Sequence, residues 1–273
     1  MSLAFAGCCA HAPGLTARVQ DAPEDQKGPY LAAQERLRAQ IAAAKLDALV
    51  LVTAEHFSNF FADNMPPFCI GIADSYEGPV EEEKFLKIPK TTVPGDAKLS
   101  EAIAASAMEA FDLSFSAELK LDHGAMVPLH YLRPEMDLKI VPVIVNCLVH
   151  PRPPMSRCYD LGKALRKAVD ARGERIGLLG CGGISHWPAQ PQAGRINQRW
   201  DRHFLDDFLN HRRRALTVDY DDATIDEEGG PGGHEIRAWT VISGATEGAV
   251  GKLHIYHPMP AFAVGGAIAT MAV

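Results

Sequence analysis

Four long apolar runs constrain the fold of this chain more than any other feature of its sequence. They cover residues 3–11, 46–56, 138–147 and 174–183, and each closes on a histidine, a cysteine or glycines. Because these runs are apolar throughout and do not alternate with polar residues, both faces of each predicted strand are apolar. Strands of this kind are typical of a sheet that other elements cover on both sides.

Two segments between these runs carry apolar residues at helical spacing. In residues 29–46 these are Ala33, Leu37, Ile41 and Ala44, and in residues 156–173 they are Cys158, Leu161, Leu165 and Val169. Ser156 is placed to cap the second helix, and Gly173 is placed to end it. Strands and helices that alternate along the chain predict an α/β fold, with a central, mostly parallel sheet flanked by helices.

The length of the chain fits one large domain. It has 273 residues, of which 47% are hydrophobic, and no linker or repeat interrupts them, so we expect residues 1–273 to form a single domain. Residues 74–96 are acidic, then basic, with three prolines, which indicates either a solvated surface loop or a lid. Residues 219–233 read as an acidic, glycine-rich loop, and residues 254–273 as an apolar segment that packs on the core or at a subunit interface.

Charge and cysteine usage exclude several classes of protein. The formal net charge is -7 and the longest basic block is Arg212–Arg214, so no nucleic-acid-binding surface is expected. No apolar stretch reaches the roughly 18 residues that a membrane helix needs, and the first residues lack the basic start of a signal peptide. Six scattered cysteines without a C-x-x-C pair favour reduced, buried thiols in a cytoplasmic protein.

Four of the 11 histidines share a setting that suggests a common site. His11, His56, His123 and His186 each lie at or just beyond the end of an apolar run, beside small or turn-forming residues. In open α/β sheets, ligands bind beyond the carboxyl ends of the strands, so these imidazoles could meet in one crevice. Glu235 follows the glycine-rich loop and opens a predicted helix, which brings a carboxylate toward the same place.

Two imidazoles and one carboxylate form the facial set that non-haem Fe(II) oxygen enzymes use, with other positions left open. The H-E-x-x-H motif is absent, so a zinc protease of that type is not indicated. A single histidine at a strand end is more often structural than metal-binding. Spacing alone therefore leaves both a metal site and a structural role open.

Five motifs in this order carry a resemblance to a known family. They are HAPG (residues 11–14), EHFSNFFADNMPPFCIG (55–71), LDHGAMVPL (121–129), GCGGISHWP (180–188) and HEIRAW (234–239). Together they resemble the class III extradiol ring-cleavage dioxygenases, which include the protocatechuate 4,5-dioxygenase beta subunit, gallate dioxygenase and 2,3-dihydroxyphenylpropionate 1,2-dioxygenase types. The segment between His186 and His234 is shorter here than in the last of these types.

The resemblance implies roles for individual residues. His11, His56 and Glu235 match the iron ligands, and His186 matches the acid–base histidine beside the metal. His123 matches a second proton-transfer histidine of the pocket. Three further residues are expected to contribute to the substrate site: Phe57, Trp187 and Asp122. Adjacency also suggests that Asp122 fixes the tautomer of His123.

The activity implied is Fe(II)-dependent extradiol cleavage of a catechol-like diol by O₂ in aromatic catabolism, carried out by the whole chain as one catalytic domain. Protocatechuate, gallate, a dihydroxyphenyl acid, an aminophenol and a dihydroxypyridine all stay open as substrates. Candidates for binding a substrate carboxylate are Arg133, Arg195 and Arg237. A homo-oligomer is expected, and a small partner subunit, as in the protocatechuate type, stays open.

Two other functions compete with this interpretation. The first is a zinc-dependent hydrolase that uses the same residues, with His186 as the base. The second is a metal-free relative that acts as a binding subunit. The complete set of ligand residues disfavours the second function.

Overall fold

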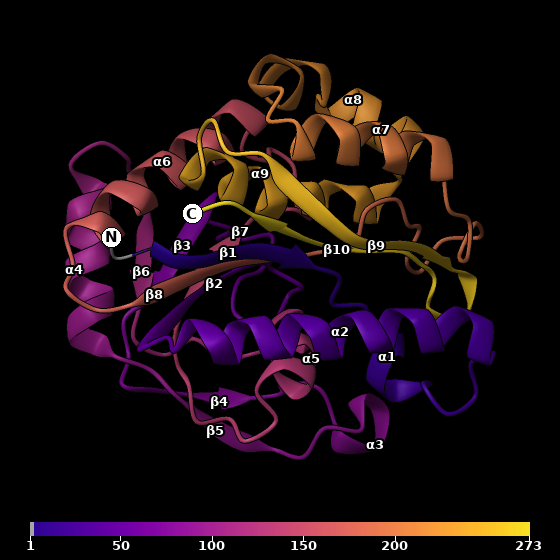
Figure 1. Cartoon of the computed structure of the whole chain (residues 1–273), viewed down its shortest axis with the longest axis horizontal. Helices are drawn as coiled ribbons and strands as arrows, with labels where there is room; N and C mark the ends of the chain where they lie inside the picture. The colour runs from indigo at the N-terminus through magenta and orange to yellow at the C-terminus, as the bar shows by residue number, and fades with distance from the viewer. Residues whose placement is uncertain (1–2) are drawn as a thin grey trace.

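The computed structural model of the protein describes residues 3–273, so Met1 and Ser2 of the predicted domain lie outside the described residues. Its centre is an eight-stranded sheet with the strand order β6-β3-β7-β2-β8-β1-β10-β9 (Figure 1). The strands of this sheet are β1 Leu3–Cys9, β2 Ala48–Ala54, β3 Phe68–Gly71, β6 Ser114–Ser116, β7 Lys139–Val145, β8 Ile176–Cys181, β9 Gly251–Met259 and β10 Val264–Met271. A separate two-stranded sheet pairs β4 Ser75–Gly78 with β5 Thr91–Pro94.

Helices lie on both faces of the large sheet. They are α1 Gly14–Ala17, α2 Glu24–Ala44, α3 Glu83–Leu86, α4 Ala97–Met108, α5 His123–Leu132, α6 Met155–Asp170, α7 Gln198–Leu209, α8 Asp222–Thr224 and α9 Ile236–Ala245. Short π-helical turns span Ala215–Asp219 and Ile225–Gly229, and 3₁₀ turns span Pro231–Glu235 and Pro260–Phe262. None of the helices in residues 3–273 combines the length and the apolar character that crossing a membrane requires.

The strand pairing confirms the predicted α/β class. The four neighbouring strands β7, β2, β8 and β1 run parallel, and β3 and β6 also pair in parallel. Antiparallel pairs join β3 to β7, β1 to β10 and β10 to β9. Each of the four predicted apolar runs contains one of the four central strands, but each strand stops two residues before the run ends.

Alternate residues of the central strands pack into two separate cores. In β2, Val50 and Val52 belong to the core under α4, α6, α7 and α9, whereas Leu49 and Leu51 belong to the core under α2 and α5. Figure 1 shows α2 and α5 on one side of the sheet and α6, α7 and α9 on the other. This two-sided burial is the reason why the strands are apolar throughout.

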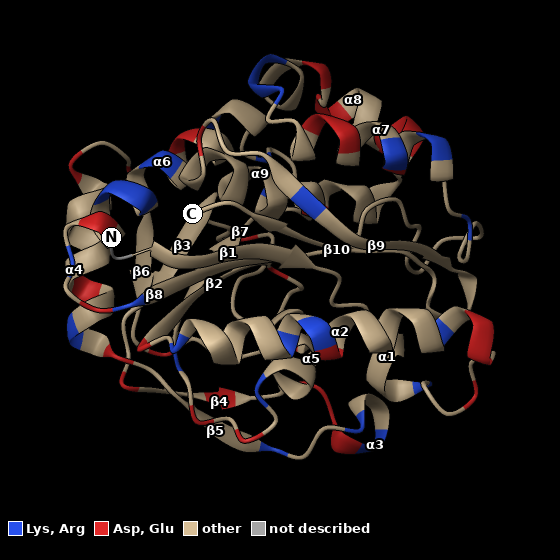
Figure 2. Cartoon of the chain, viewed as in Figure 1, with Lys and Arg blue, Asp and Glu red and all other residues tan. Residues whose placement is uncertain are grey.

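Charged residues lie around this apolar centre. Figure 2 shows blue and red segments mainly on the helices and loops, while β1, β2 and β8 are tan throughout. The six cysteines are buried and free, as the sequence predicts. The buried sheet therefore carries no charge on its three innermost strands.

The structure corrects several boundaries predicted from the sequence. α2 begins at Glu24, so Pro29 lies inside this helix and does not start it. The apolar stripe of α6 is buried as predicted, but Pro154 is its N-cap and Ala171 its C-cap, so the cap roles of Ser156 and Gly173 are wrong. A proline that precedes the first turn starts this helix without any side-chain cap.

Two predicted loops contain regular structure. Most of residues 219–233 are helical turns that lead directly into α9, and residues 74–96 form the β4–β5 sheet with α3 between its strands. The C-terminal segment packs on the core, as predicted, because β10 pairs with β1 and β9 pairs with β10. Its strand β9 is the edge of the large sheet.

Helices α6 and α9 cross with their backbones in close contact at two glycines. A Cβ atom added to Gly162 would overlap the carbonyl oxygen of Val241, and one added to Gly244 would overlap the carbonyl oxygen of Tyr159. Backbone atoms cannot move aside as a flexible side chain can. The crossing also fixes α9, the helix that begins directly after Glu235.

Gly162→Ala should therefore lower the free energy of unfolding by about 1 to 3 kcal/mol, because the added methyl group forces α6 away from α9. Gly173→Ala is the matched control, because a Cβ atom there has no neighbour within 4 Å. Urea unfolding of both variants measures the difference. Equal stabilities would contradict the close contact between the helices.

Candidate active site

One cavity gathers the five side chains that the sequence marks as the candidate site. It has a volume of about 960 Å³, and His11, His56, His123, His186 and Glu235 all line it. The central strands are parallel and in register, so the segments that follow them meet at the same edge of the sheet. His11 follows β1, His56 follows β2, and His186 follows β8, while α5 and the turn before α9 bring His123 and Glu235.

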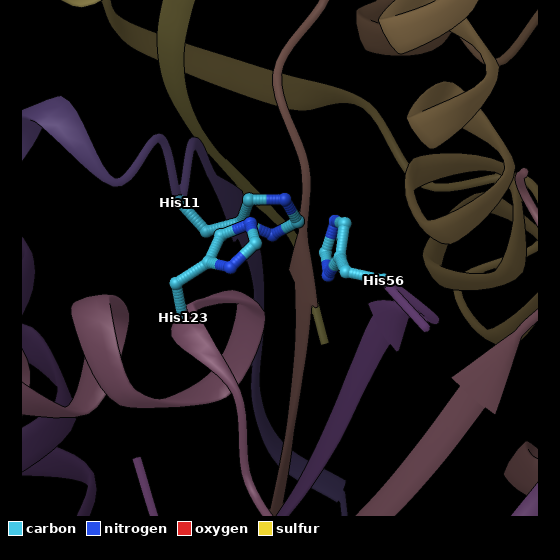
Figure 3. A group of neighbouring side chains, drawn as sticks. All are labelled: His11, His56 and His123. Atoms are coloured by element: carbon cyan, nitrogen blue, oxygen red, sulfur yellow. The ribbon is translucent and has the colours of Figure 1, made fainter. Parts of the chain in front are cut away.

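Glu235 lies between the imidazoles of His11 and His56. Its Oε2 atom is 3.1 Å from His11 Nε2, and its Oε1 atom is 3.5 Å from His56 Nε2. Figure 3 shows the rings of His11, His56 and His123 turned toward one another from three separate elements. The side chains of His11 and Glu235 are almost fully buried, and that of His56 is mostly buried.

The contact between His11 and Glu235 fits a shared cation better than a hydrogen bond. His11 Nε2 is buried and has no hydrogen-bond partner, although the carboxylate oxygen is close enough for one. Neighbouring donors around one octahedral ion lie roughly 3 Å apart, which matches these separations. Two imidazole nitrogens and one carboxylate are therefore suitably placed to hold a divalent metal.

Hydrogen bonds behind the donor atoms fix their orientation. Asp122 accepts a bond from His56 Nδ1 at 2.9 Å, and Glu235 Oε2 accepts one from the backbone N–H of Gly183 at 2.6 Å. The Thr53 hydroxyl lies 3.4 Å from His11 Nδ1. Partners of this kind leave Nε2 of each imidazole free for the metal.

The charges of the site suit metal binding. Burial would raise the pKa of Glu235, but the neighbouring imidazoles of His11 and His186 hold it well below its usual range. Burial lowers the pKa of His11 and favours its neutral form. Burial would also lower the pKa of His56, but the Asp122 and Glu235 carboxylates raise it to about 10.

His186 is oriented toward the same carboxylate. Its Nδ1 donates to the Ile184 carbonyl at 3.0 Å, so Nε2, which lies 3.4 Å from Glu235 Oε1, is the atom that gains or loses a proton. Burial would lower the pKa of His186, but the Glu235 charge raises it above its ordinary value. This imidazole can take up and release a proton inside the cavity.

The structure corrects the expected partner of Asp122. Asp122 is the N-cap of α5 and accepts bonds from Gly124 N–H, His56 and Ser58, so it orients His56 and not His123. The partner of His123 is Glu81, whose Oε1 lies 2.6 Å from His123 Nδ1. Burial would raise the pKa of Glu81, but its bonds from His123 hold it below the usual range.

Sequence reasoning did not identify Glu81. It lies in the run Glu81–Glu83, which resembles an ordinary solvated charge cluster. Only the hydrogen bonds of the folded chain distinguish it from its neighbours.

The two aromatic residues predicted for the substrate site occupy different positions. Phe57 lines the cavity, half-exposed, and stacks on Phe61 with 6.3 Å between ring centroids. Trp187 is buried behind the cavity wall with Arg195 over its ring, and the next residues along the chain, Pro188 and Ala189, form the wall.

The predicted arginines are engaged elsewhere. Arg133 pairs with Asp137, Arg195 lies over Trp187, and the fully buried Arg237 bonds Asp222. Three other cationic side chains line the cavity instead: Arg18, Lys84 and Lys87. The last two belong to α3 and its C-cap, so the 74–96 segment reaches the candidate site.

A second triad overlaps the first. His11, His56 and His123 each offer a ring nitrogen, and these three atoms lie within 4.8 Å of one another, so this group could also hold a metal ion. The ring centroids of His56 and His123 are 4.1 Å apart, whereas those of His11 and His123 are 5.6 Å apart. The two triads differ in whether Glu235 or His123 is the third donor.

A buried carboxyl group supports the loop that carries His186. Asp201 accepts bonds from the Ser185 N–H and from the Tyr256 hydroxyl, at 2.9 and 2.6 Å. Burial raises the pKa of Asp201 to about 6, against these bonds, which lower it. The folded chain therefore retains the proton of Asp201 to a higher pH than the unfolded chain does.

Asp201→Asn, which imitates the protonated form, should remove the pH dependence that Asp201 gives to the free energy of unfolding. The contribution of Asp201 to stability is present below pH about 4 and is lost as the pH rises through about 6. Relative to the variant, the wild type should lose about 2 to 3 kcal/mol of unfolding free energy between these limits. Urea unfolding of both proteins between pH 4 and pH 7 measures this loss. A stability difference between wild type and variant that stays constant with pH would contradict the prediction.

Comparisons with known proteins identify the family of this chain. A family profile described as the catalytic LigB subunit of aromatic ring-opening dioxygenase matches residues 5–267. A 2,3-dihydroxyphenylpropionate/2,3-dihydroxicinnamic acid 1,2-dioxygenase of Mycolicibacterium vanbaalenii is 29% identical, over 96% of this chain and 96% of its own. A protein of the same name from Cupriavidus necator is 30% identical over 87% of each chain.

A solved structure shares the fold. The crystal structure of an uncharacterized protein from Escherichia coli K12 matches 98% of this chain and 99% of its own, with a TM-score of 0.65 and 14% identity. That similarity concerns the fold alone.

The family profile spans nearly the whole chain, and we conclude that the protein belongs to the LigB family of extradiol, aromatic ring-opening dioxygenases.

Proposed function

We propose that this enzyme cleaves a catechol-like diol with O₂ in an extradiol reaction that depends on Fe(II), and that the whole chain acts as one catalytic domain. His11, His56 and Glu235 would hold the iron. The observation that carries the proposal is the buried His11 Nε2, which has no hydrogen-bond partner and faces the Glu235 carboxylate at 3.1 Å. Two nitrogens and one oxygen are the donor set that suits Fe(II) with open positions for substrate and O₂.

We favour Glu235 over His123 as the third ligand. Glu235 approaches both imidazoles, at 3.1 and 3.5 Å, and its carboxylate offsets part of the charge of a divalent ion. The Nδ1 atom of His123 is bonded to Glu81, and its ring lies further from His11 than from His56. His123 would then face the substrate from beside the metal.

The side chains supply proton transfer and binding. Bound iron would supply a Lewis acid for the diol oxygens and a centre for activating O₂. His186 Nε2, with Nδ1 held by the Ile184 carbonyl, would accept a proton from a substrate hydroxyl. His123, which also lines the cavity, would be the second proton-transfer group, exchanging a proton with the substrate through Nε2.

A diol that carries a carboxylate fits the cavity best. Arg18 and Lys87 line the cavity and offer positive charge to a substrate acid group, whereas Lys84, which also lines it, is paired with Glu82. The relatives named above carry the names of dioxygenases for dihydroxyphenyl acids. We therefore propose a dihydroxyphenyl acid such as 2,3-dihydroxyphenylpropionate as the first substrate to test.

A zinc hydrolase is the competing function, and oxygen consumption separates the two. Anaerobic protein reconstituted with Fe(II) should consume O₂ when the diol and air are added. Activity that zinc restores, without uptake of O₂, would support the hydrolase instead.

Replacement of a proposed ligand should remove iron and activity together. His11→Ala and Glu235→Ala should each lose bound iron, because only two donors would then remain. Metal analysis of protein purified anaerobically measures this loss. His203→Ala, an exposed histidine on α7, is the control and should retain iron. Full iron occupancy in both ligand variants would contradict the assigned centre.

His186→Ala should separate binding from turnover. The variant should keep its iron and lose about 100-fold or more in kcat, because a positioned acid–base group contributes at least this much. Oxygen uptake under saturating diol gives kcat, and metal analysis checks occupancy. Normal turnover in the iron-loaded variant would rule out the proposed role of His186.

A further inference from the structure

We propose that Glu81 is a positioning residue for His123, and that the segment covering the cavity thereby orients one of its proton-transfer groups. The proton-transfer role of His123 rests on the proposed function. The orientation of its ring by Glu81 rests on hydrogen bonds alone.

The first observation is a two-point contact. Glu81 Oε1 accepts from the backbone N–H of His123 at 3.0 Å and from its Nδ1 at 2.6 Å. An ionised carboxylate only accepts, so Nδ1 must carry the proton. The neutral ring then has its lone pair at Nε2, which is the atom left to exchange a proton in the cavity that His123 lines.

The second observation is that the backbone sets Glu81 opposite His123. Leu121 N–H donates to the Glu77 carbonyl at 2.8 Å, and its own carbonyl accepts from Val80 N–H at 2.8 Å. The ammonium group of Lys90 donates to the carbonyls of Pro79 and Val80, the two residues just before Glu81. These contacts fix residues 77–80, which precede Glu81, beside the residues that precede α5.

The third observation is the burial of the pair. The Glu81 and His123 side chains are 19% and 15% exposed, whereas the next glutamate along the chain, Glu82, is 70% exposed. Glu81 Oε2 is also buried without a hydrogen-bond partner. A carboxylate oxygen left unpaired costs free energy, so the placement of Glu81 is hard to explain by stability alone.

Position in the chain connects this pair to the cavity wall. Glu81 comes directly before α3, and Lys84, Phe85 and Lys87 from this segment line the cavity. The 74–96 segment therefore contributes both a wall and the partner of His123. Displacement of this segment would break the bonds between Glu81 and His123, so the His123 ring would lose its fixed tautomer. It would also open the cavity.

Nitrogen NMR of the histidine rings tests the proposal directly. The sample is the whole protein, labelled with ¹⁵N at histidine and loaded with Zn²⁺ as a diamagnetic substitute for iron. His123→Ala identifies the His123 signals by their absence. Wild type should show His123 with Nδ1 protonated and Nε2 bare.

Variants at Glu81 should show whether its hydrogen bonds or its charge fix the tautomer of His123. Glu81→Ala should give a mixture of tautomers at His123, while Glu81→Gln should keep the wild-type pattern because its amide oxygen can accept the same two bonds. Glu82→Ala is the matched control and should leave His123 unchanged. An unchanged His123 tautomer in Glu81→Ala would overturn the proposal, as would a changed one in the Glu82 control.

Turnover gives an independent readout. With 2,3-dihydroxyphenylpropionate as the probe, Glu81→Ala should lose about 10- to 100-fold in kcat with little change in KM, and Glu81→Gln should recover most of it. Equal losses in the two variants would show that the charge, and not the orientation, matters, and would overturn the positioning role. If wild type does not turn over this diol or related ones, the proposed function fails, whereas the NMR comparison still decides whether Glu81 positions His123.

Discussion

The Glu235 carboxylate, buried among imidazoles, is the interaction on which the candidate site depends. His11, His56 and His186 each bring Nε2 to within 3.5 Å of this group, from the ends of three different strands. A buried carboxylate is costly unless it is paired, and an imidazole that lacks a hydrogen bond is costly as well. A divalent ion shared by His11, His56 and Glu235 would relieve both costs at once, which is why we propose the metal at this point.

The scaffold maintains this arrangement from both faces of the sheet. Strands β1, β2 and β8 are parallel and neighbouring, so the loops that carry the three histidines leave the sheet at one edge. From one face, the close crossing of α6 and α9 at Gly162 and Gly244 fixes the helix that follows Glu235. From the other, Asp122 caps α5 and bonds His56 with the same carboxylate, so the capping of α5 and the orientation of His56 depend on one side chain.

The sequence predicts the central strands and the gathering of the site, because long apolar runs and the polar residues that close them are local signals. It does not predict which partner each side chain finds. Asp122 is adjacent to His123 in sequence but bonds His56, since its role as an N-cap turns it away from the next residue. Glu81 is 42 positions from His123 and resembles any solvated glutamate, so only the backbone bonds of the β4–β5 segment bring the two together.

Anomalous diffraction at the iron edge, from crystals grown anaerobically with Fe(II), tests the central assignment most directly. We expect one peak within about 2.2 Å of His11 Nε2, His56 Nε2 and a Glu235 oxygen, with His123 outside bonding distance. A peak bonded to His123 with Glu235 withdrawn, or a peak away from this cavity, would contradict it.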